Sequence, residues 1–69
     1  MSILSNEDKI AIINQHKRNV EYSKYNLEIS VILENAVVNP NKETIDSLNE
    51  KISDLDKKIL VLDAELASL

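Results

Sequence analysis

Residues 45–69, IDSLNEKISDLDKKILVLDAELASL, decide the fold of this 69-residue chain. An apolar side chain recurs in this stretch at alternating steps of three and four residues. A repeat of about 3.5 residues is typical of a helix that packs against a neighbouring helix as a left-handed coiled coil. The segment therefore predicts one long helix with an unbroken seam of isoleucine and leucine, formed by Ile45, Leu48, Ile52, Leu55, Ile59, Leu62, Leu66 and Leu69.

The only proline of the chain lies just before this segment. In residues 38–41, VNPN, Pro40 disfavours helical geometry at Asn39, so a preceding helix is expected to end at about residue 38. Asn39 or Asn41 can then cap the second helix. Because the chain has no glycine, the residue that tight turns most often require, we expect only this one connection.

The start of the first helix is readable at Ser5. Ser5 and Asp8 have the spacing of a capping box, and Glu7 and Asp8 place negative charge in the first turn, where the helix dipole favours it. No glycine or proline follows before Pro40. One uninterrupted helix is therefore expected from Asn6 onward.

The chain is thus predicted to be all-α, an antiparallel helical hairpin of two long helices, about 6–38 and 41–68, with coiled-coil packing. Residues 1–69 form a single domain, with 1–5 as an N-terminal extension and 39–41 as the interhelical turn. Because so short a turn returns the second helix alongside the first, the numbers of contacting residues should sum to about 80.

The first helix carries two apolar rows on opposite sides. Val20 and Ile29 show the relation, because nine residues at about 100° each amount to about two and a half turns. A second helix can cover only one of these rows, and the pattern does not decide which. The first row is Ile10, Ile13, Val20, Leu27, Val31 and Val38, and the second is Tyr22, Tyr25, Ile29, Ile32, Leu33 and Ala36.

A row left in water forgoes about 1.5 to 3 kcal/mol for each large apolar side chain. A chain of this length also has little core of its own. We therefore expect self-association, in the simplest case as a homodimer of hairpins forming a four-helix bundle, with a larger helical bundle as the alternative. The predicted core and oligomer interface consists of Val20, Tyr22, Tyr25, Leu27, Ile29, Val31, Ile32, Ala36, Ile45, Leu48, Ile52, Leu55, Ile59, Leu62 and Leu66.

Charges in the second helix affect whether the second helices of two copies would pair in a parallel or an antiparallel orientation. In a parallel pair of second helices, Lys51 would face Asp56 of the other copy and Lys58 would face Asp63. Both pairs favour the parallel arrangement, but exposed ion pairs contribute little. The orientation of the subunits therefore stays open.

Two lysines interrupt the first apolar row. Lys17 and Lys24 occupy positions where a regular heptad repeat would place apolar residues. One interpretation is that their aliphatic stems cover the edge of the seam while the ammonium groups reach water. The other is that they select the register or the partner, as polar core residues do in coiled coils.

No constellation of residues indicates catalysis or a cofactor. His16 is the only histidine and cysteine is absent, so a metal site would need ligands from other chains. The carboxylates of the second helix alternate with Lys51, Lys57 and Lys58, as on a solvated helix face. We therefore predict no enzyme activity, no metal and no cofactor.

Nucleic-acid binding through the first helix is the least favoured alternative. Its basic residues, 16–18 and Lys24, are partly offset by Glu21 and Glu28, and the chain as a whole carries a net charge of −4. A nucleic-acid interface normally needs a concentrated basic face. The acidic neighbours of the two tyrosines also argue against base stacking.

The expected function is that of a structural or interaction protein, an assembly element or adaptor whose main partner is another copy of itself. No apolar run exceeds four residues, so a cytoplasmic protein without membrane contact is expected. The abundance of Asn, Ile and Lys is typical of small phage or bacterial reading frames. The alternative is accordingly a phage-encoded regulator that binds a larger host or viral protein, with a virion-associated location as the variant.

Overall fold

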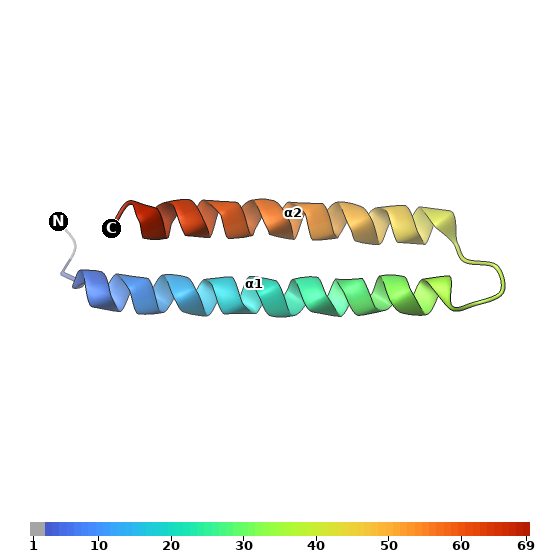
Figure 1. Ribbon diagram of the computed structural model, residues 1–69, viewed down its shortest axis with the longest axis horizontal. Helices are drawn as coiled ribbons and strands as arrows, with labels where there is room; N and C mark the ends of the chain where they lie inside the picture. The colour runs from blue at the N-terminus through green and yellow to red at the C-terminus, as the bar shows by residue number, and fades with distance from the viewer. Residues whose placement is uncertain (1–2) are drawn as a thin grey trace.

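The computed structural model describes residues 3–69, which form two long helices joined by one loop (Figure 1). Helix α1 spans Asn6–Asn35 and helix α2 spans Lys42–Ala67. The helices lie side by side and antiparallel, with the start of α1 and the end of α2 at one end of a rod that measures 55 × 15 × 14 Å (Figure 1). The predicted all-α hairpin is confirmed. Residues 1–2 of the predicted N-terminal extension lie outside the described residues.

Both helices begin at the kind of cap that the sequence predicts. The backbone N–H of Asp8 donates to Ser5 Oγ at 3.1 Å, and the N–H of Thr44 donates to Asn41 Oδ1 at 3.1 Å. Each bond satisfies a donor that the first turn of a helix leaves without an intrahelical partner. Of the two asparagines considered for the second cap, Asn41 has that role.

Helix α1 ends at Asn35, three residues before the predicted end, and the connection is 36–41 instead of 39–41. No described residue has a positive φ, which agrees with the absence of glycine and of a left-handed helix cap. The helix closes instead with a tight turn in which Ala36 N–H donates to the Leu33 carbonyl at 3.2 Å. The far end of the loop is tied back to α1, because Asn41 N–H donates to Glu34 Oε1 at 2.9 Å.

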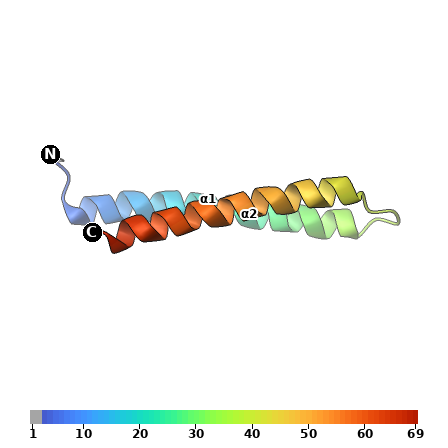
Figure 2. The same ribbon diagram turned by 90° about the horizontal axis from the view of Figure 1, so that it is seen from above.

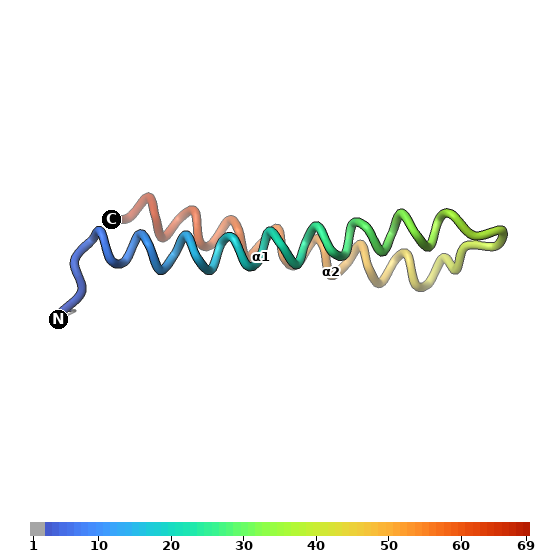
Figure 3. The backbone as a smooth tube through the Cα atoms, turned by 90° about the horizontal axis from the view of Figure 1, so that it is seen from below, coloured from blue at the N-terminus to red at the C-terminus, as the bar shows by residue number. Residues whose placement is uncertain are grey.

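Two ion pairs between the helices define the register. Lys17 Nζ lies 2.7 Å from Asp63 Oδ1, and Lys24 Nζ lies 2.6 Å from Asp56 Oδ1. Both pairs of residue numbers sum to 80, as expected for the short connection. The two helices cross at a shallow angle near their middles, so each stays close to the other along most of its length (Figures 2 and 3).

The contact between the helices is made by one row from each, which we call the inner seam. Within residues 3–69 no side chain is fully buried, because each helix has only one neighbour and water reaches both edges of the seam. Three predicted members fall outside it: Ile10 is exposed, Val38 lies in the loop, and Leu69 lies beyond the end of α2. The half-buried apolar members are Ile13, Val20, Leu27, Val31, Ile45, Leu48, Ile52, Leu55, Ile59, Leu62 and Leu66.

Candidate interaction surface

One flank of the inner seam is closed by the two interhelical ion pairs. Lys17 and Lys24 come from the first apolar row and reach across to Asp63 and Asp56, leaving the lysine side chains about one-third exposed. The hydrogen bond to Asp63 and its charge raise the pKa of Lys17, and the hydrogen bond to Asp56 raises the pKa of Lys24. The polar positions in the first row therefore contact the chain's own second helix.

These ion pairs change the expectation for the orientation of two copies. Asp56 and Asp63 are held by lysines of α1 in the same chain. They are therefore already occupied, and the predicted contacts with Lys51 and Lys58 of a second copy lose their basis. The charge argument for parallel second helices no longer applies.

The hairpin is expected to lose stability as the pH rises above about 10.5, because the pKa of Lys17 and of Lys24 is raised from 10.5 in the folded chain. The folded state then holds these protons more tightly than the unfolded chain. Their contribution is complete below the unfolded pKa and is lost as the pH rises through the folded pKa.

Thermal unfolding between about pH 9 and pH 12 tests this expectation. The matched control is the double variant Lys17→Met, Lys24→Met, which lacks both ion pairs but keeps both tyrosines. The melting temperature of the unmodified chain should fall more steeply with pH than that of the double variant. Equal pH dependence of the two proteins would contradict the proposed contribution of the ion pairs.

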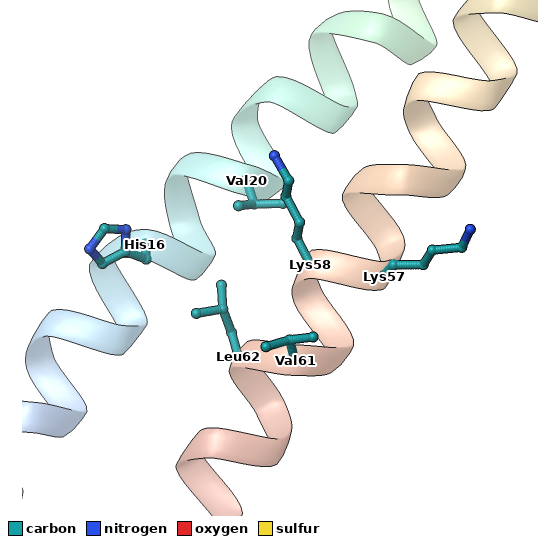
Figure 4. Close-up of a pocket in the computed structure, with 6 residues that line it drawn as sticks. All are labelled: His16, Val20, Lys57, Lys58, Val61 and Leu62. Carbon is teal, nitrogen blue, oxygen red and sulfur yellow. The ribbon is translucent and has the colours of Figure 1, made fainter.

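The opposite flank of the inner seam is an open, shallow groove. Part of it is lined by Val20 and Leu62, with His16 and Lys58 at its rim; Leu62 points from α2 toward α1, whereas Lys57 points away from it (Figure 4). The groove continues past Lys58 toward the loop, where polar side chains line it beside two leucines: Ser23, Asn26, Leu27, Lys51, Asp54 and Leu55.

Among the described residues, this flank lacks the continuous apolar surface that a compact helical bundle needs, and it lacks a group of side chains that could bind a metal. A bundle core needs a continuous apolar wedge between the helices, and serine, asparagine and lysine side chains interrupt it here. In the part of the chain that the structure describes, no three His, Cys, Asp or Glu side chains are grouped so that they could hold a metal ion. The groove is therefore not the surface that stands out on this molecule.

The second apolar row of α1 lies on the outer face, away from α2. Four of its large side chains are mostly exposed: Tyr22 by 77%, Tyr25 by 65%, Ile32 by 61% and Leu33 by 63%. Ile29 is half-buried, since it lies in a hollow that it shares with the two tyrosines on the same helix. The structure thus settles which row is internal: the first row meets α2, and the second has no partner among residues 3–69.

The outer row has a regularity that reasoning from apolar residues alone missed. Apart from Leu33, its members follow alternating steps of three and four residues, and the same spacing continues backward to Arg18. This spacing is the pattern of a second coiled-coil seam, and the signal was present in the sequence. We call it the outer seam, formed by Arg18, Tyr22, Tyr25, Ile29, Ile32 and Ala36.

A smaller apolar patch lies on α2, level with the middle of α1 in the observed register. Leu60 and Val61 are each about two-thirds exposed. The inner-seam residues beside them, Leu62 and Leu66, are half-buried. The two outward apolar surfaces therefore belong to different helices.

None of the described helices combines the length and the apolar character that crossing a lipid bilayer requires. The chain matches no protein-family model, and neither a curated protein nor a solved structure shows significant similarity to it.

Proposed function

We propose that this hairpin is a non-enzymatic structural protein that self-associates through the outer seam and acts as an assembly element or adaptor. The observation that carries the proposal is the outer face of α1, where four large apolar side chains are each more than 60% exposed. Contiguous exposed apolar surface of this kind is typical of protein interaction sites. It occurs here in a chain whose described residues include no fully buried side chain.

The energetics favour a covered outer seam. Complete burial of a large apolar side chain contributes about 1.5 to 3 kcal/mol, so covering Tyr22, Tyr25 and Ile32 of this seam adds several kcal/mol for each chain. Small domains have a net stability of only about 5 to 15 kcal/mol. Association through this seam would therefore supply a substantial part of the stability of the folded state.

The positions of the two seams favour a layered dimer over a compact four-helix bundle. In a compact bundle each helix meets its two neighbours on faces about a quarter of a turn apart. The inner and outer seams of α1 are about half a turn apart, as Val20 and Ile29 show. Helix α1 would then lie between its own α2 and the second subunit, with the two α2 helices on the outside.

Such a dimer leaves the α2 patch free for a different protein. Leu60 and Val61 lie on α2, which is the outer helix of the layered arrangement. This patch supports the adaptor role. It is also the observation that favours the second candidate function, a small regulator that binds a larger host or viral protein.

The solution mass measured by light scattering tests the proposal. We expect twice the mass of one chain at micromolar concentration, and a folded monomer at all concentrations would contradict self-association. A pull-down with a tagged chain separates the two functions. An assembly element should recover untagged copies of itself, whereas a regulator should recover one foreign protein in stoichiometric amount and no second copy.

A further inference from the structure

We infer that the outer seam of α1 pairs with the outer seam of a second copy running in the opposite direction, so that Arg18 of each chain lies against the C-terminal turn of its partner's α1. This inference rests on the proposed self-association and specifies its geometry. The helix that covers the outer seam is thus α1 of an identical chain.

The first argument is that the seam complements itself in only one antiparallel register. When contacting residue numbers sum to about 54, Tyr22 faces the partner's Ile32 and Tyr25 faces the partner's Ile29. Each aromatic ring then meets an aliphatic side chain, and every apolar seam position is covered. At about 1.5 Å per residue the seam is about 28 Å long, so the pairing uses about half of the 55 Å rod.

The second argument is electrostatic. Arg18 forms no ion pair among residues 3–69, and the last turn of α1 contains no basic side chain. The carbonyl groups that end a helix carry partial negative charge, which a nearby cation stabilises. The antiparallel register places Arg18 beside the partner's Ala36, the C-cap of that helix.

A parallel pair would lose both advantages. In register, Arg18 would face the partner's Arg18 across the seam, and like charges at facing positions are unfavourable. The C-terminal turns of the two α1 helices would also lie side by side without a cation. The distribution of charge along the outer seam therefore selects the antiparallel arrangement.

The α2 patch of a second copy fits the seam less well. It offers only two large apolar side chains, Leu60 and Val61, beside Lys57, which carries a charge. The outer seam presents apolar residues from Tyr22 to Ala36. A second α1 covers that whole length, whereas the α2 patch would leave most of it exposed.

Cysteine cross-linking tests the inference, because the chain contains no cysteine of its own. We expect an equimolar mixture of Tyr22→Cys and Ile32→Cys chains to form a disulfide-linked pair under mild oxidation. Neither variant alone should cross-link. In the antiparallel register equal positions are about 15 Å apart, and a disulfide requires Cα atoms within about 7 Å.

A parallel dimer gives the reverse pattern, in which each variant cross-links with itself and the mixture adds no mixed pair. That result would overturn the inference while leaving self-association intact. The pair Arg18→Cys and Ala36→Cys repeats the test at the end of the seam, where no large apolar side chain is removed.

Light scattering of the reduced samples separates failure of the inference from failure of the proposed function. A dimeric mass with no cross-link in either pair of variants would mean that another surface occupies the seam, which overturns the inference. A monomeric mass for the unmodified chain would overturn the proposed self-association itself.

Discussion

Replacing Ile52 with Asp is expected to unfold the hairpin. Ile52 is half-buried at the middle of the inner seam, level with Leu27 and Val31 of α1 in the observed register. The variant loses the apolar contact and places a carboxylate among the apolar side chains of the seam, at a cost of about 3 kcal/mol. A domain of this size has little stability in reserve.

Far-ultraviolet circular dichroism measures the result. We expect the helical signal at 25 °C to fall by more than half and the cooperative thermal transition to disappear. Ser53→Asp is the matched control, because Ser53 is the next residue along α2 and is exposed. Its stability should change by no more than about 0.5 kcal/mol. If the two variants unfolded at the same temperature, Ile52 would not belong to the inner seam.

The second large effect is expected from Ile29→Asp, which should separate the subunits while the hairpin stays helical. Ile29 lies on the face of α1 opposite the inner seam, in the hollow beside Tyr22 and Tyr25. A dimer contains two copies, so the change removes two apolar contacts with Tyr25 of the other chain and places two carboxylates in the apolar interface. The dissociation constant should rise by about a hundredfold or more.

Light scattering measures the mass of the Ile29→Asp protein, and circular dichroism measures its helical content. The mass should fall to that of one chain, and most of the helical signal should persist at 25 °C with a lower melting temperature, since association no longer stabilises the fold. Asn19→Asp is the control, because it adds the same charge at an exposed position of α1 outside the outer seam. A dimeric Ile29→Asp protein would refute the assignment of the outer seam as the interface. Complete loss of helix would show that the two seams do not act independently.

Local chemistry accounts for most of the agreement between prediction and structure. Ser5 and Asn41 cap the helices because their side-chain oxygens lie one turn from free backbone donors, and that relation depends only on nearby residues. The end of α1 was harder to predict, since Pro40 excludes helix only at its neighbour. The helix ends at Asn35 because the chain also needs residues to cross to α2 and closes the loop with the bond between Glu34 and Asn41.

The sequence by itself determined that there are two helices, where they begin, how they are registered and which faces are apolar. The apolar faces follow from spacing at about 100° per residue, the helix starts from capping residues, and the register from the short connection. Only the tertiary structure decided which apolar row of α1 meets α2, because both rows are apolar enough to pack against a helix. The physical reason lies in pairs of residues distant in sequence: Lys17 and Lys24 flank the first row and meet Asp63 and Asp56 across the helices. The outer seam has no such counterpart in the part of the chain that the structure describes, so Tyr22, Tyr25 and Ile32 stay exposed.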